Sequence, residues 1–188
     1  GTVADGTFGG YVIRGVAGAL PGSSDTAFQF TGTESSRVTM AGNTNFNFTG
    51  TRAFTLECWA KPTATLSSSQ RLIANGSSGQ GYAFCFQGTT QLRITGFGVA
   101  DVSSDVAPAA FAPGQWYHLA VVRNGTNVFF YTNGVQFGSS KVLNNIITTG
   151  VAGDGATVAS LVNAAPRILK VQPGLVLMTD IGVQRGNI

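Results

Sequence analysis

Short runs of alternating or continuous apolar residues recur along the chain, and Gly, Asn, Ser or Pro stands in nearly every gap between them. A period of two is typical of β-strands, and this punctuation is typical of the turns that join them. The predicted strands span residues 27–30, 37–41, 53–61, 71–74, 81–87, 91–94, 116–123, 126–132, 135–141, 157–162, 167–171 and 175–183. No window sustains an apolar stripe of helical period, and only residues 158–165 compete as a short helix. The pattern predicts an all-β fold, a two-sheet antiparallel jelly-roll sandwich.

The clearest local signal is a pair of Asn-Gly dipeptides. Asn124-Gly125 and Asn133-Gly134 separate three β-rich runs between residues 116 and 141. Because Asn-Gly favours the type I′ turn of a two-residue hairpin, these runs predict a three-stranded antiparallel meander.

The middle run of this meander carries Phe129, Phe130 and Tyr131 in succession. Side chains alternate between the two faces of a strand, so aromatic rings cover both faces of this one. That arrangement indicates either a central strand or a ligand on the second face.

Charged residues are scarce. Of 188 residues, 11 are Lys or Arg and 8 are Asp or Glu, whereas 21 Thr, 14 Ser and 11 Asn supply uncharged polar groups. The length and the hydrophobic share of 43% suit a single domain, which we assign to residues 1–188 with a lead-in and linker over residues 1–24. A neutral, hydroxyl-rich surface suits sugars or packing against copies of the same chain, because few charges repel a neighbouring molecule.

Charge and hydropathy also argue against two classes of partner. The 11 cations are spread from Arg14 to Arg185 without a cluster, so we expect no nucleic acid partner. The longest apolar stretch is far shorter than the roughly 18 residues of a membrane span, so we expect no membrane-spanning segment. The start, Gly1-Thr2-Val3, lacks a signal-peptide pattern, and we expect a chain that was cut, processed or excerpted before Gly1.

Three segments carry a resemblance to a known family. They are AFTLECWAKP at residues 53–62, QWYHLAVVRNG at 115–125 and FYTNG at 130–134. Together with the opening runs 27–32 and 37–40 and the linker-like stretch 15–20, they resemble the laminin-G-like branch of the concanavalin A-like lectin/glucanase superfamily. The resemblance covers residues 15–137 well and residues 175–183 in outline, and it implies a jelly roll of this type.

Two features depart from that family pattern. Members often begin with a strand bearing an aromatic pair upstream of the linker, so we expect either residues 1–11 or another chain to supply this sheet edge. Asn133 stands where the family commonly has Asp before Gly. The exchange removes a carboxylate but suits a type I′ turn equally well.

The superfamily includes glycoside hydrolases, which need two carboxyl groups about 5–9 Å apart. On a strand this requires acids two or four positions apart, because alternate side chains share a face. Glu57 has Thr55 and Trp59 at those positions, and Asp101 and Asp105 fall in a Ser-rich segment predicted to be a loop. We therefore expect no catalytic residues and no enzymatic activity.

His118 is the sole histidine. Its parity places it with Trp116, Ala120 and Val122, and the family tends to have His there without catalytic use. We interpret it as a structural imidazole, hydrogen-bonded to a neighbouring loop, rather than a catalytic base. One His without a Cys pair at metal spacing also argues against zinc.

Relatives commonly bind calcium through loop carboxylates and carbonyls, and this ion takes six to eight oxygen ligands. The candidate acids are Asp25, Asp101, Asp105, Asp154 and Asp180, none of them in a liganding run. We expect no cofactor, and calcium is the alternative.

The strand at residues 53–61 is expected to place Glu57 and Trp59 on one face and Cys58 on the other, with a neighbouring strand or an Arg satisfying Glu57. Cys85 lies in a strand expected near this one. A cross-sheet disulfide and two buried thiols both fit this arrangement.

Function does not follow from this fold alone. Our first hypothesis is a non-catalytic recognition module that binds a glycan or a protein surface. Its candidate ligand contacts lie on or beside adjacent predicted strands and offer stacking or planar hydrogen bonding: Asn75, Tyr82, Gln87 and Arg93. The alternative is a structural assembly protein, such as a bacteriophage decoration, capsid-surface or tail-fibre subunit, which the low charge favours. Both hypotheses imply an extracellular or virion surface and a homo-oligomer or larger assembly.

Overall fold

The structure is a computed structural model that describes residues 6–33, 35–42, 44–77, 79–107, 109–147 and, as backbone only, 156–158. Within these ranges the regular elements are β-strands and one short 3-10 helix, η1 (Thr44–Phe46). None of the described elements is a helix long and apolar enough to cross a membrane.

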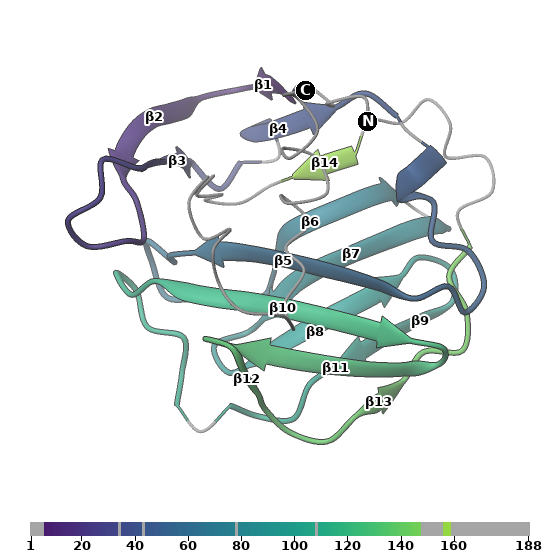
Figure 1. Ribbon diagram of the computed structural model, residues 1–188. Coiled ribbons are helices and arrows are strands. Elements are labelled where there is room, and N and C mark those ends of the chain that lie inside the picture. Colours follow the sequence, from purple (N-terminus) through teal and green to yellow (C-terminus); the bar gives the residue numbers. More distant parts are fainter. Residues whose placement is uncertain are drawn as a thin grey trace, which may run out of the picture.

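Two antiparallel sheets and a two-stranded ribbon make up the described part of the chain (Figure 1). There, the larger sheet has the strand order β1 (Gly6–Gly9), β4 (Arg37–Met40), β14 (Ala156–Val158), β6 (Ser69–Ser77), β7 (Gln80–Gln87), β8 (Gln91–Gly96) and β9 (Ala100–Ser103). The smaller sheet has the order β12 (Val135–Gln136), β11 (Asn127–Thr132), β10 (Tyr117–Asn124) and β5 (Phe54–Ala60), and β13 (Lys141–Val142) also pairs with β11. The ribbon consists of β2 (Val12–Ala17) and β3 (Thr26–Phe30).

The apolar core lies between the two sheets, where β5, β10 and β11 cross in front of β6, β7 and β8 (Figure 1). Phe84 and Leu92 of the larger sheet and Leu119 and Phe130 of the smaller one are at most 1% exposed. The expected faces of β5 are confirmed, because Cys58 and its alternate neighbours are buried and belong to the core while the intervening residues do not. The predicted two-sheet antiparallel sandwich is therefore confirmed.

The meander of β10, β11 and β12 is confirmed, but its two turns differ. Thr132 pairs with Val135, and the turn residues Asn133 and Gly134 both have positive φ, at 52° and 79°, as a type I′ turn requires. Asn124, in contrast, is not a turn residue, because it pairs with Asn127 at the end of the strand.

The central residues of the first turn are therefore Gly125 and Thr126. Only Gly125 has positive φ, at 63°, which is the pattern of a type II′ turn. The type I′ prediction for Asn124-Gly125 is wrong, because the strand continues one residue further than the dipeptide suggests.

Several strand predictions need correction. The segment with Asp101 is strand β9 and not a loop, and β2 was not expected. The run at 135–141 is broken into β12 and β13. β1 pairs with β4 at the edge of the larger sheet, so residues within 1–11 do supply a sheet edge. The strands predicted at 167–171 and 175–183, and most of the segment at 157–165, lie outside the described residues.

Two hairpin ends meet backbone to backbone at one end of the larger sheet. A Cβ added to Gly81 would collide with the carbonyl oxygen of Asn75, and one added to Gly98 would lie 2.6 Å from the carbonyl oxygen of Gly79. Such approaches require glycine, since any side chain would force the two backbones apart. We call Gly79, Gly81 and Gly98 the glycine corner.

Candidate functional site

The outer face of the larger sheet, meaning the side that points away from the core, brings together two of the predicted ligand contacts. Alternate side chains of β7 enter the core, so Cys85 and Gln87 point outward. The strand register sets Cys85 opposite Arg71 on one side and Arg93 on the other. Gln87 and Arg93 therefore share this face with Arg71, which the sequence did not single out.

Hydrogen bonds hold the polar side chains of the outer face in place. Arg93 donates from Nη1 to Asp101 Oδ2 at 3.0 Å and from Nε to Ser103 Oγ at 3.3 Å. The hydroxyl of Ser69 donates to Oε1 of Gln87 at 2.5 Å. The side chain of Arg93 remains 23% exposed and that of Asp101 53% exposed. The face thus offers solvent a fixed layer of planar donors and acceptors.

Arg71 adds a second cation to this layer. It is exposed, and its guanidinium carbon lies 5.3 Å from the ring centre of Phe97, within the range of a cation–π contact. Between the two arginines, burial raises the pKa of the Cys85 thiol to about 11, an effect that Arg93 and Arg71 partly offset. This thiol stays protonated at neutral pH, so it is not a nucleophile.

The two cysteines do not form a disulfide. Cys58 points into the core from β5, whereas Cys85 points outward from β7 in the other sheet. Of the two alternatives that the sequence left open, the one with two buried thiols is confirmed.

Asn75 and Tyr82, the other two predicted contacts, point to the inner side of the same sheet and are 4% and 2% exposed. Asn75 Nδ2 at 3.0 Å and the Tyr82 hydroxyl at 3.1 Å both donate to the carbonyl oxygen of Phe46. The Tyr82 ring also stacks on Phe48, with ring centres 5.3 Å apart. Both side chains hold the η1 segment against the sheet and offer no surface to a ligand. The prediction is corrected for these two residues, and for Gln87 and Arg93 it stays a prediction.

On the outer side of the smaller sheet, His118 lies beside Glu57. His118 Nε2 is 3.4 Å from Glu57 Oε2, and the two side chains are 10% and 5% exposed. The imidazole also packs against Trp59, its register partner, with ring centres 5.3 Å apart. The loop residue Asn133 bonds instead to the backbone of His118, whose N–H donates to Asn133 Oδ1 at 2.9 Å. Among the described residues, the imidazole therefore faces the carboxylate of a neighbouring strand and not a loop, which corrects the expected partner.

The acids that could form a hydrolase or calcium site are separated in the described part of the chain. Asp101 is ion-paired on the outer face, Asp105 follows β9 in a loop, and Glu57 belongs to the other sheet. No three His, Cys, Asp or Glu side chains among the described residues lie close enough to share a metal ion. Asp154 and Asp180 lie outside the described residues, so calcium binding stays untested.

Comparison with known sequences finds one family over most of the chain. The model of the laminin-G type, described as the concanavalin A-like lectin/glucanases superfamily, matches residues 30–160. A search of curated proteins finds no significant match.

Comparison with solved structures finds the same sandwich in bacterial proteins. The binding domain of Paraclostridial Mosquitocidal Protein 1 aligns with a TM-score of 0.61 and 17% identity over 86% of this chain and 40% of that one. The binding domain of botulinum neurotoxin serotype G aligns with a TM-score of 0.54 and 14% identity over 85% of this chain and 42% of that one. Domain 4 of AbnA, a GH43 extracellular arabinanase from Geobacillus stearothermophilus, solved in complex with arabinotriose, has a TM-score of 0.54 and 14% identity over 82% of this chain and 71% of that one. The chain thus spans about two fifths of the two toxin chains, and these likenesses show a shared fold.

Proposed function

Because this chain belongs to the concanavalin A-like lectin/glucanase superfamily, we propose that it is a non-catalytic recognition module that binds a glycan across the outer face of its larger sheet. The observation that carries the proposal is the placement of Arg71 and Arg93 in one row across β6, β7 and β8, on either side of Cys85, with Gln87 two residues further along β7. Neighbouring strands lie about 4.8 Å apart, so the two arginines stand roughly 10 Å apart across the sheet. That span is enough to contact more than one sugar ring.

The chemistry of this face suits sugar hydroxyls. Guanidinium and carboxamide groups are planar and can pair with two neighbouring hydroxyls at once, which fixes the orientation of a ring. The carboxylate on the described outer face is Asp101, which Arg93 holds in an ion pair. Glycoside hydrolysis needs two carboxyl groups, so this surface supports recognition without turnover. The similar structures also support the proposal, since two are named as binding domains and the third was solved with an oligosaccharide.

Calorimetric titration with arabinotriose, preceded by a glycan array, tests the proposal. We expect saturable binding by the wild type and about 10- to 100-fold weaker binding by Arg71→Ala and Arg93→Ala, because a hydrogen bond to a charged group contributes about 1.5–3 kcal/mol. Arg52→Ala is the matched control, because Arg52 is exposed in the loop before β5. No array binding, or equal affinity in the three variants, contradicts the proposal.

An assembly protein is the second candidate function. Three large apolar side chains are exposed: Val106 in the loop after β9 at 66%, and Val135 and Val142 in the short strands β12 and β13 of the smaller sheet at 68% and 59%. Such a group suits a contact between copies of the chain at an extracellular or virion surface. Light scattering on dilute protein separates the two candidates. A monomer that binds glycan supports the module, and a stable oligomer without glycan binding supports the assembly protein.

A further inference from the structure

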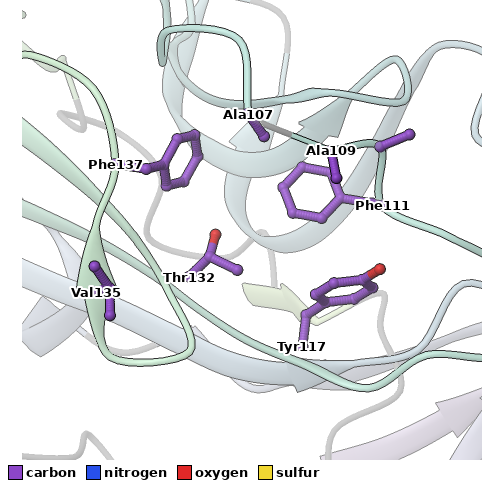
Figure 2. Close-up of a pocket in the computed structure, with 8 residues that line it drawn as sticks. Ala107, Ala109, Phe111, Tyr117, Thr132, Val135 and Phe137 are labelled. Atoms are coloured by element: carbon purple, nitrogen blue, oxygen red, sulfur yellow. The ribbon is translucent and has the colours of Figure 1, made fainter.

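A cavity of about 340 Å³ opens between the two sheets, where β10 begins and β11 ends (Figure 2). Three aromatic rings surround it. They belong to Phe111 in the loop after β9, to Tyr117, which is the first residue of β10, and to Phe137 in the segment after β12. Ala109 and Val135 line its mouth, and both are exposed. The cavity lies away from the outer face that we propose for glycan.

The lining favours an uncharged ligand with a flat ring. None of the described residues that line the cavity is charged, so an ion entering it would lose hydration without gaining a partner. The rings of Phe111 and Tyr117 meet edge to face, with centres 5.2 Å apart and planes at 88°. Rings in this arrangement leave both a face and an edge for a third ring.

Two hydroxyl groups give the cavity a polar end. The Oγ1 atom of Thr132 is buried and has no hydrogen-bond partner among the described residues, and it points between the rings of Phe137 and Phe111 (Figure 2). A buried polar atom left unpaired is costly, so a ligand group that reaches it gains a hydrogen bond. The Tyr117 hydroxyl accepts the backbone N–H of Ala112 at 2.8 Å and still has its own proton to donate.

Hydrogen bonds fix one wall of the cavity without a ligand. The N–H groups of Ala107 and Phe111 donate to the carbonyl oxygens of Thr90 and Thr89, both at 2.7 Å. These bonds tie the loop after β9 to the turn between β7 and β8.

Asp105 ties this loop to the opposite wall. Its carboxylate accepts from the Ser139 N–H at 2.7 Å, from the Ser139 hydroxyl at 2.9 Å and from the ammonium of Lys141. Ser139 and Lys141 lie shortly after Phe137 in sequence, so the two walls are braced against each other. A preformed cavity binds more tightly, since no loop has to be ordered on binding.

We propose that this cavity is a second binding site, specific for a small, neutral, mainly apolar ring compound that carries one hydroxyl group. Its volume is at the lower end of typical ligand pockets and has room for two fused rings. The hydroxyl pairs with Thr132 when the side chain turns about its Cα–Cβ bond to bring the buried Oγ1 to the cavity, and the rings pack among Phe111, Tyr117 and Phe137. The proposal does not depend on glycan binding.

Titration of the full chain with 2-naphthol and with naphthalene, followed by NMR, tests the proposal. We expect saturable 2-naphthol binding, with ring-to-ring Overhauser contacts to Phe111 and Phe137. Ala109→Phe fills the mouth and should weaken binding at least tenfold. Ala53→Phe is the matched control, because Ala53 is also exposed in a loop but does not line the cavity. Retained arabinotriose binding by Ala109→Phe would show that the two sites are separate.

Thr132→Val tests the hydroxyl directly, because it keeps the side-chain shape. We expect 2-naphthol to bind about 2- to 10-fold more weakly, the range of one neutral hydrogen bond, while naphthalene binds as before. A purely structural role for Thr132 would shift both affinities together. Absence of saturable 2-naphthol binding by the wild type, or unchanged binding by Ala109→Phe, overturns the site. An unchanged ratio of the two affinities in Thr132→Val overturns the assigned hydrogen bond.

Discussion

Two buried donors hold the carbonyl oxygen of Phe46, and this redundancy allows a quantitative prediction. Tyr82→Phe removes one donor, but Asn75 Nδ2 remains at 3.0 Å, so the carbonyl stays paired and the ring keeps its stacking. We expect this change to cost about 0.5–1.5 kcal/mol, the net value of one hydrogen bond. Asn75→Ala removes the other donor and a longer bond to Asn47 Oδ1 at 3.4 Å, and it should cost about 1–3 kcal/mol.

The double variant should lose more than the sum of the two. There, the carbonyl of the half-buried Phe46 has lost both side-chain donors, and leaving such a group unpaired costs up to about 1–3 kcal/mol. Tyr82→Phe should therefore cost about 1 kcal/mol more in the Asn75→Ala background than in the wild type. These four proteins form a double-mutant cycle. The space left by Asn75→Ala is present whether or not Tyr82 is also replaced, so its cost cancels when the coupling is calculated.

Urea unfolding of the four proteins measures this coupling, with free energies taken from the midpoints at a common slope. Tyr11→Phe is the control for loss of a phenol, because Tyr11 is 73% exposed and should change stability by less than about 0.5 kcal/mol. Additive costs within about 0.3 kcal/mol would refute the shared acceptor. A Tyr82→Phe variant as unstable as the double variant would refute it too.

Three further predictions concern titration and the backbone. The pKa of the Cys85 thiol rises from its ordinary 9.0 to about 11 in the folded protein, so its contribution to stability is present below pH 9 and lost as pH approaches 11. Between pH 9 and pH 11, the urea midpoint of Cys85→Ala should therefore fall less than that of the wild type. An equal fall in the two proteins would argue against a raised thiol pKa. Hydrogen bonds from Lys141 and Ser139 lower the pKa of Asp105 from 3.8 to about 2, so its contribution is present above pH 4 and lost as pH falls toward 2. The melting temperatures of wild type and Asp105→Asn should differ at pH 6 and converge near pH 2, and a constant difference would contradict this origin. Gly81→Ala should lower the melting temperature far more than Gly88→Ala. Both glycines have positive φ, but only Gly81 touches another backbone, and Gly88 has open space around it. A similar fall in melting temperature for both variants would count against the close backbone approach.

The period-two pattern predicted the strands with strong apolar alternation, and it failed where a strand depends on its partner. The sequences of β1 and β9, GTFG and ADVS, are only 4 residues long, which is too short for a period of two to stand out. They are strands because β4 and β8 offer open edges to pair with. Strand formation of this kind reflects the context of the sheet rather than the propensity of its residues.

For the candidate site, the sequence identified Gln87 and Arg93 but missed Arg71. A register shift between Arg71 and Ile73 breaks the alternation along β6, so parity could not place Arg71 on the outer face. Tyr82 could have been excluded from sequence alone. It stands an odd number of positions from Gln87 on one strand, so the two must face opposite sides.

The diagonal contact of Glu57 with His118 required more than parity. It joins two segments about sixty positions apart, and it depends on the register that sets His118 opposite Trp59. Register across such a separation is set by the packing of the whole sheet, which a local pattern does not contain.

The glycine corner has a consequence for how this protein can diversify. A side chain at Gly98 would separate the two hairpins, and one at Gly81 would separate the paired strands β6 and β7, so this end of the sandwich is closed to gradual variation at these two positions. At the opposite end, the loop after β9 and the segment that includes β12 and Phe137 carry side chains around the cavity. New specificities in descendants of this chain should therefore arise at that end, and lineages that change the glycine corner should do so by inserting or deleting residues.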